Sequence, residues 1–176
     1  MLTRWSAPDA DQDALRHTYL AFCAARDDAH LRVCAPGHIT ASAVVLSPDL
    51  RRTLLTLHPR VGAWLQLGGH LEEGDTSLAA AARREAVEES GIDVQLDPEP
   101  VELHCHPIRC RGYTETTRHL DVRFVAVAPE GAQEQISDES DDLRWFDVDD
   151  LPRVPDEVAV LVRRAVSHMR SRAAAS

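Results

Sequence analysis

The chain has 176 residues, enough for one domain with a buried core, and a net charge of −10 at pH 7. An acidic chain without a basic cluster is not expected to bind nucleic acid or an anionic membrane surface. No apolar run is long enough for a transmembrane helix and the N-terminal segment lacks the apolar stretch of a signal peptide, so we expect a cytoplasmic protein.

The first half of the chain predicts a helix, then strands, then a second helix. The first helix is expected over residues 11–29, with the apolar stripe Leu15, Tyr19, Phe22 and Cys23. Strands are expected over residues 38–47, 53–58 and 64–67, of which the first two form a hairpin. Paired glycines then lead into a helix over residues 77–90, with Gly91 at its C-cap.

The second half predicts three more strands, over residues 101–108, 120–128 and 143–148, and a final helix that begins at Pro155. In the strand 120–128 the apolar residues alternate with Asp121 and Arg123, which occupy the opposite face. Strands and helices mix without regular βαβ alternation, which favours the α+β class.

Three segments are expected along the chain. Residues 1–36 form an N-terminal helical extension packed on the domain, residues 37–170 form the main domain, and the Ala/Ser-rich residues 171–176 form a disordered tail.

The segment 68–92, GGHLEEGDTSLAAAARREAVEESGI, carries the strongest functional signal. At helical spacing i, i+3, i+4, the carboxylates of Glu85, Glu88 and Glu89 share one face. Like charges at this spacing repel by roughly 0.2–0.5 kcal/mol per pair, so they do not stabilise the helix. Mg²⁺ prefers hard oxygen ligands and would reverse that repulsion.

A solvated acidic helix face is the simpler alternative for these glutamates. The small apolar residues Leu78, Ala81 and Ala82 lie in the same helical sector, however, so this sector is expected to be partly buried. Unpaired buried carboxylates are costly, and a bound metal removes that cost. The pattern therefore favours a metal site.

The order Gly69, five residues, Asp75, then REAVEESGI from Arg84 resembles the Nudix box, G-x5-E-x7-R-E-U-x-E-E-x-G-U, with U aliphatic. Two positions depart from it: Asp75 replaces Glu, and eight residues instead of seven separate it from Arg84. Both departures lie before the acidic half of the motif, which is intact.

The resemblance implies a Nudix-like α/β/α sandwich with a mixed β-sheet. It also implies Glu85 and Glu89 as direct metal ligands, Glu88 as a ligand of another ion or one reached through water, and a carbonyl ligand at Gly68. Arg84 would orient the acidic cluster. The implied activity is Mg²⁺-dependent hydrolysis of a pyrophosphate linkage, with Mn²⁺ as a substitute, and a homodimer is compatible with the family.

The sequence predicts the proton acceptor and the substrate-binding residues less specifically than the metal ligands. The acceptor is expected among the box glutamates, such as Glu89, or in the acidic loop 136–142, where Glu139 is the candidate and a plain surface loop the alternative. The substrate-binding candidates are His70, Arg60, Trp64 and Arg118. A single histidine, arginine or tryptophan is more often an ordinary surface or core residue than a substrate-binding one.

The cysteines are Cys23, Cys34, Cys105 and Cys110, and we expect free thiols in a cytosolic protein. The run His104-Cys105-His106 with Cys110 allows a zinc interpretation. Its C-x4-C spacing lacks a second half, and strand alternation points Cys105 away from both histidines, so zinc is disfavoured.

Two other functions fit a Nudix-like chain. One is an enzyme resembling isopentenyl-diphosphate isomerase, whose members depart from the full box. The other is a non-catalytic domain that binds a nucleotide metabolite, which usually accompanies a degraded box. Because the acidic half is intact, hydrolysis of a nucleoside diphosphate linked to another moiety, or of a nucleoside triphosphate, is the preferred prediction.

Overall fold

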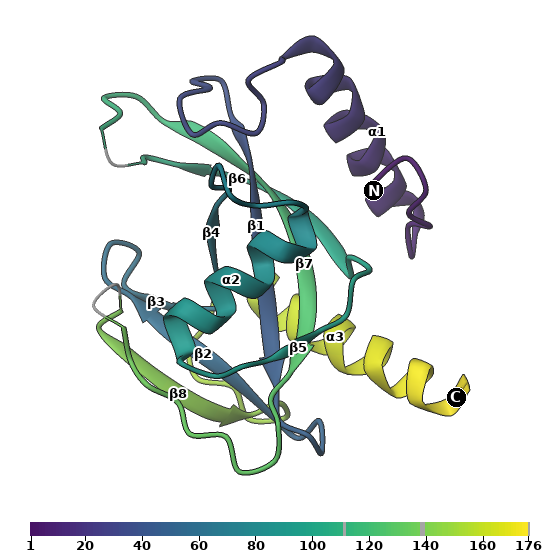
Figure 1. Cartoon of the computed structure of the whole chain (residues 1–176), viewed down its shortest axis with the longest axis vertical. Helices are drawn as coiled ribbons and strands as arrows, with labels where there is room; N and C mark the ends of the chain where they lie inside the picture. The colour runs from purple at the N-terminus through teal and green to yellow at the C-terminus, as the bar shows by residue number, and fades with distance from the viewer. Residues whose placement is uncertain (111, 138–139, 176) are drawn as a thin grey trace.

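The structure is a computed structural model that describes residues 1–110, 112–137 and 140–175. Its helices are α1 (Ala10–Ala25), α2 (Leu78–Ser90) and α3 (Asp156–Ala175) (Figure 1). Its strands are β1 (His38–Leu46), β2 (Arg52–His58), β3 (Ala63–Leu65), β4 (Leu67–His70), β5 (Gln95–Leu96), β6 (Glu102–Ile108), β7 (Thr117–Val127) and β8 (Asp142–Asp147).

The centre of the sheet is the parallel pair β1 and β7, in which His38 lies opposite His119 and Leu46 opposite Val127. The other edge of β1 is shared by two antiparallel partners, β4 along its first half and β2 at its end. Strands β6 and β5 pair with β7, and β3 and β8 pair with β2. This sheet is mixed, as predicted.

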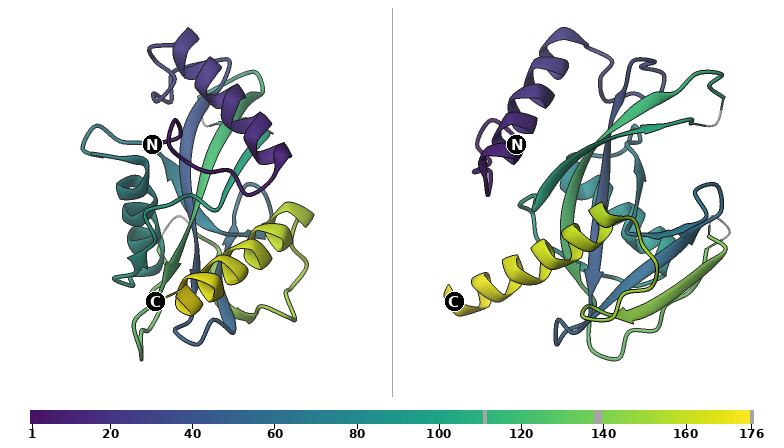
Figure 2. Two further views of the ribbon diagram at one scale, coloured as in Figure 1. Left: turned by 90° about the vertical axis from the view of Figure 1, so that its right-hand side faces the viewer. Right: turned by 180° about the vertical axis from the view of Figure 1, so that it is seen from behind.

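Alternate residues of β1 face two different helices. Ile39, Ala41 and Ala43 lie in a buried cluster with the small residues of α2, whereas Val44 and Leu46 lie in a second cluster with α3. Figure 2 shows α2 and α3 on opposite faces of the sheet. The predicted arrangement of a mixed sheet between helices is confirmed.

Helix α2 begins and ends where its sequence predicts. Ser77 is the N-cap, and its Oγ accepts a hydrogen bond of 3.1 Å from the backbone N–H of Ala80. Gly91 adopts the left-handed conformation (φ 68°), and its N–H donates to the carbonyl of Val87. Both caps are local features, so they fix the helix that carries the glutamates.

Helix α1 differs from its prediction in length and in its buried face. It ends at Ala25, and Cys23 is exposed. Gln12 is buried instead, because its side-chain amide both donates to the carbonyl of Leu103 and accepts from the N–H of Leu103. These two bonds attach α1 to the edge of β6.

Two further boundaries differ. The predicted strand 64–67 is divided between two strands, β3 and β4, because the chain pairs first with β2 and then with β1, and β4 includes the paired glycines. Helix α3 continues to Ala175, through residues expected to form a disordered tail, and Arg172 contacts Asp97 with an Nε–Oδ2 distance of 3.1 Å. No helix in the described part of the chain is long and apolar enough to cross a membrane.

Candidate active site

The paired glycines of β4 lie against the glutamates of α2. The backbone N–H of Gly68 donates a hydrogen bond of 2.9 Å to Oε2 of Glu89. Glu85 and Glu89 are only 9% and 8% exposed, whereas Glu88 is exposed. The structure thus brings together four of the residues predicted for the metal site, with two carboxylates held in a mostly buried position.

Each glycine makes room that a side chain would fill. A Cβ on Gly69 would lie 2.8–2.9 Å from the carboxylate atoms of Glu85. A Cβ on Gly68, whose φ is 151°, would lie 2.4 Å from Cα of Ser42 on β1. Strand β4 therefore requires glycine at Gly68 for its close pairing with β1 and at Gly69 for the approach of Glu85.

Arg84 connects this loop to the helix. Its Nη1 donates to Oε1 of Glu85 at 3.0 Å and to Oε2 of Glu88 at 2.9 Å, and its Nη2 donates to the carbonyl of His70 at 2.9 Å. Its remaining hydrogen bonds are with Asp75, from Nε at 3.1 Å and from Nη2 at 3.0 Å. Arg84 thus contacts two of the three box carboxylates.

The contact with Asp75 gives a role to the residue that departs from the motif. The hydrogen bonds from Arg84 hold the pKa of Asp75 below its usual value, despite partial burial. Asp75 also accepts a hydrogen bond of 2.8 Å from the N–H of Glu72. The carboxylate therefore fixes the loop before α2 and stays ionised beside the arginine.

A cavity of about 360 Å³ opens beside Gly68, Gly69 and Glu89. It lies on the α3 side of the sheet, and its other lining residues come from β1, β2, β6, β7 and the start of α3. They include Thr40, Ser42, Thr56, His58, Gln66, His106, His119, Asp121, Arg123 and Glu157. A second cavity, of about 440 Å³, lies along α3 away from the glutamates, so we assign the site to the first.

A buried ionic network underlies this cavity. Asp121 accepts hydrogen bonds from the hydroxyls of Thr40 (2.9 Å) and Ser42 (2.7 Å) and from Nε of Arg123 (3.1 Å). Arg123 is 2% exposed, and its Nη1 donates to Glu102 at 2.9 Å. Burial alone would raise the pKa of Asp121, but the charge of Arg123 and the two hydroxyls outweigh it and lower the pKa.

The sequence predicts only part of this network. Asp121 and Arg123 were placed on the face of their strand opposite the apolar residues, and that face forms the cavity. Thr40, Ser42 and Gln66 could not be associated with them, since that requires the register between β1 and β7 and the path of the chain beside β4.

None of the four predicted substrate-binding residues, His70, Arg60, Trp64 and Arg118, lines the cavity. Trp64 packs edge-to-face on Phe146, with ring centroids 4.8 Å apart, which agrees with a packing role. Arg60 lies in the exposed turn that follows β2, between His58 at the end of that strand and Val61, which both line the cavity. Arg118 is exposed, and strand alternation places it on the opposite face from His119. Glu139 lies outside the described residues.

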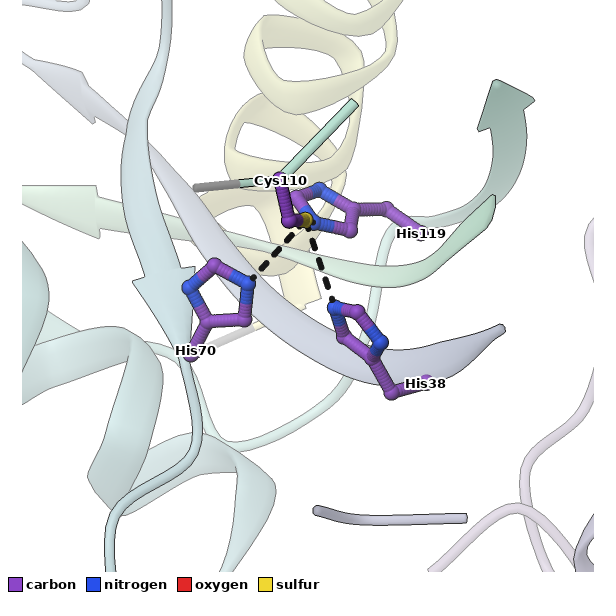
Figure 3. A group of neighbouring side chains, drawn as sticks. All are labelled: His38, His70, Cys110 and His119. Carbon is purple, nitrogen blue, oxygen red and sulfur yellow. Dashed lines mark hydrogen bonds between the residues drawn. The ribbon is translucent and has the colours of Figure 1, made fainter. Parts of the chain in front are cut away.

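His70 belongs to a separate group with His38, Cys110 and His119, whose possible ligand atoms all lie within 4.8 Å of one another (Figure 3). The C-x4-C spacing of Cys105 and Cys110 has no second half in the sequence, but the structure places Cys110 beside histidines of three other strands. His104 and His106 are not in this group and stack on each other with ring centroids 5.4 Å apart. Cys105 is exposed, as strand alternation indicated, and all four cysteines are free.

The sequence from residue 36 to residue 167 matches the family model of the NUDIX domain. The chain belongs to the Nudix family. This assignment confirms the predicted resemblance and, at the level of the family, the prediction of a Nudix-type pyrophosphohydrolase. Helix α1 lies outside the matched Nudix segment.

Solved structures of several hydrolases share this fold. A NUDIX-family hydrolase from Clostridium perfringens aligns with a TM-score of 0.58 at 22% identity, over 75% of this chain and 97% of that one. The C. elegans Ap4A hydrolase, in a binary complex, aligns with a TM-score of 0.58 at 19% identity, over 76% and 98%. The E. coli dihydroneopterin triphosphate pyrophosphohydrolase aligns with a TM-score of 0.58 at 21% identity, over 74% of this chain and 95% of that one. A search of curated protein sequences gave no match.

Proposed function

We propose that the chain is a Mg²⁺-dependent hydrolase that cleaves a pyrophosphate linkage in a nucleoside diphosphate linked to another moiety, or in a nucleoside triphosphate. The observation that carries the proposal is the position of the buried carboxylates of Glu85 and Glu89 beside the paired glycines of β4, with Glu89 lining a cavity. Two structurally similar proteins are named as hydrolases of Ap4A and of dihydroneopterin triphosphate, which supports a polyphosphate substrate.

The residues present fit a magnesium ion. The carboxylates of Glu85, Glu88 and Glu89 offer hard oxygen donors, and Gly69 leaves space beside Glu85 that a Cβ would fill. We propose Glu85 and Glu89 as the main ligands, with Glu88 and the carbonyl of Gly68 as further ones and Mn²⁺ as a substitute ion. Magnesium bound there would neutralise charge on phosphate oxygens and lower the pKa of a coordinated water.

Groups of the protein itself hold the proposed metal ligands in position. The N–H of Gly68 fixes one oxygen of Glu89, and Arg84 holds Glu85 and Glu88. We assign Glu89 as the acceptor of the proton that the attacking water loses. The water oxygen bonds to phosphorus, the anhydride P–O bond breaks, and the departing phosphate group keeps the electron pair. Glu139 is the second candidate for the proton acceptor.

The cavity supports binding of the part of the substrate that does not react. Its volume lies in the range of small-molecule sites, about 300–1,000 Å³. The buried Oε1 of Gln66 has no hydrogen-bond partner within the described residues, whereas its Nε2 lies 3.4 Å from Asp121. A donor on the ligand, such as an amino or hydroxyl group, would satisfy this oxygen.

A screen for phosphate release, with and without Mg²⁺, tests the proposal. The panel contains ADP-ribose, nucleotide sugars, dinucleoside polyphosphates, NADH, coenzyme A and nucleoside triphosphates, coupled to a phosphatase or pyrophosphatase. We expect metal-dependent release from one class. Silence of the folded protein across the panel would instead favour the isomerase or the non-catalytic binding domain.

A cytoplasmic location and a homodimer belong to the same proposal. Light scattering coupled to size-exclusion chromatography measures the mass in solution, and a mass of one chain would contradict the homodimer. Fractionation of cells that make the full chain would test its location.

A further inference from the structure

Four side chains outside the acidic cluster converge at one end of the sheet. His38 begins β1, His70 ends β4, Cys110 follows β6, and His119 lies in β7 (Figure 3). Sγ of Cys110 lies 3.7 Å from Nε2 of His38, 3.7 Å from Nε2 of His70 and 3.1 Å from Nε2 of His119. The same ring nitrogen of every histidine thus faces one sulfur.

These distances match the edges of a zinc coordination tetrahedron. Zn–S bonds of about 2.3 Å and Zn–N bonds of about 2.0–2.1 Å at tetrahedral angles separate sulfur and nitrogen by about 3.6 Å. The three observed separations lie within about half an ångström of that value. The ligand atoms of the three histidines lie within 4.8 Å of one another, against about 3.3 Å between nitrogens in a zinc tetrahedron, so the rings would move closer together on binding an ion.

The sheet register produces the convergence. His38 pairs directly with His119 across the parallel β1–β7 ladder, so both side chains leave the same face. His70 pairs with Thr40 on the other edge of β1, which places it on that face as well. The connection between β6 and β7 then brings Cys110 over the three rings. The four positions are held by different strands, and a shared ion would link them.

Hydrogen bonding alone explains the arrangement poorly. A thiol is a weak donor and its sulfur a weak acceptor, so the three contacts between Cys110 and the ring nitrogens would be weak as hydrogen bonds. The rings of His38, His70 and His119 lie with centroids 5.0 Å apart in each pair. Nδ1 of His38 lies 3.4 Å from the carbonyl oxygen of Cys34, so Nδ1 is the protonated nitrogen and Nε2 presents its lone pair.

We propose that His38, His70, Cys110 and His119 bind one zinc ion in a structural site that is distinct from the Nudix carboxylates. A thiolate with three imidazoles is a ligand set for zinc and unsuitable for Mg²⁺, which prefers oxygen. Four protein ligands close the tetrahedron, and zinc sites without an open position are structural. The proposal does not depend on the proposed hydrolase activity.

The site would stabilise the strand that presents the paired glycines. His70 directly follows Gly69, and its carbonyl accepts a hydrogen bond from Arg84. Zinc binding would therefore hold β4, β1 and the β6–β7 connection together next to the acidic cluster. Loss of the ion is expected to lower thermal stability.

Metal analysis of the full chain, purified without metal-affinity chromatography, is the first test. We expect about one zinc per chain in the wild type and in Cys105→Ser, and little zinc in Cys110→Ser. Cys105 is the matched control because it is an exposed thiol on the adjoining strand. Equal zinc in the two cysteine variants would overturn the proposal.

Cobalt replacement keeps the test decisive if Cys110→Ser does not fold or if zinc is lost during purification. Metal-free wild-type protein titrated with Co²⁺ should develop thiolate-to-cobalt charge-transfer absorption, saturating at about one ion per chain, and zinc should abolish it. The melting temperature should rise by roughly 5 °C or more on adding zinc, and Mg²⁺ should not replace it. Folded wild-type protein without the cobalt band or the thermal shift would contradict a zinc site.

Discussion

Arg84 donates two hydrogen bonds to Asp75, from Nε to Oδ1 at 3.1 Å and from Nη2 to Oδ2 at 3.0 Å. These two hydrogen bonds connect the loop before α2, which holds Asp75, to α2 itself, which holds Arg84. They involve the residue that departs from the usual motif in both identity and spacing. The departure is therefore accommodated by a direct ionic contact, and Arg84 still reaches Glu85 and Glu88.

Arg84→Ala is expected to lower Mg²⁺-dependent turnover by about 10- to 100-fold, because a residue that orients metal ligands affects metal affinity and rate. Arg83→Ala is the control: Arg83 is adjacent on the same helix, but its partner is the exposed Asp93. Steady-state kinetics at several Mg²⁺ concentrations measure the turnover of both variants. Equal losses in the two variants would show that Arg84 has no orienting role.

The lowered pKa of Asp75 predicts how its contribution to stability depends on pH. A carboxyl with a depressed folded-state pKa stabilises the fold above its unfolded pKa, about 3.9, and this contribution is lost as pH falls through the folded value. The difference in unfolding free energy between the wild type and Asp75→Asn should be constant near neutral pH and shrink in acid. Urea titrations at a series of pH values measure it, and a difference that grows in acid would contradict the ion pair.

Gly69→Ala should reduce activity far more than stability. The added Cβ would meet the end of the Glu85 side chain, which can move, but its movement displaces a proposed metal ligand. Gly74→Ala, in the loop between β4 and α2, meets no atom within 4 Å and serves as the control. Mg²⁺ affinity by calorimetry, together with thermal melting, separates the two effects. Unchanged Mg²⁺ binding in Gly69→Ala would remove Glu85 from the ligand set.

Arg123→Ala should destabilise the protein by about 3 kcal/mol or more, because it leaves the buried carboxylates of Asp121 and Glu102 without their shared cation. The control is Arg144→Ala, since Arg144 forms an exposed pair with Asp142 that is worth about 1 kcal/mol or less. Urea unfolding measures both. Similar losses would show that the network beneath the cavity contributes no more than a surface ion pair.

Sequence reasoning succeeded where the determinants are local. The spacing of Glu85, Glu88 and Glu89 fixes their shared helical face, and Ser77 and Gly91 fix the helix boundaries through their own hydrogen bonds. The alternation in β7 likewise separated Asp121 and Arg123 from the core residues. These features depend on neighbours within a few positions along the chain.

Features that depend on strand register could not be predicted in the same way. Cys110, His119 and His38 come together only when β1 pairs in parallel with β7. No local sequence pattern encodes that pairing. A histidine at the start of one strand and another in a distant strand each resemble ordinary strand residues. Gln12 is similar, since its burial depends on the docking of α1 against β6.

Turnover of Glu89→Gln measured with saturating Mg²⁺ on the best substrate of the panel tests the central claim most directly. The substitution removes a charge at nearly constant shape and retains an oxygen that can accept the hydrogen bond from Gly68. The account predicts a loss of at least about 100-fold with an unchanged fold, and little change for the exposed Glu73→Gln. Wild-type turnover in a folded Glu89→Gln variant would contradict the assignment of this carboxylate to the active site.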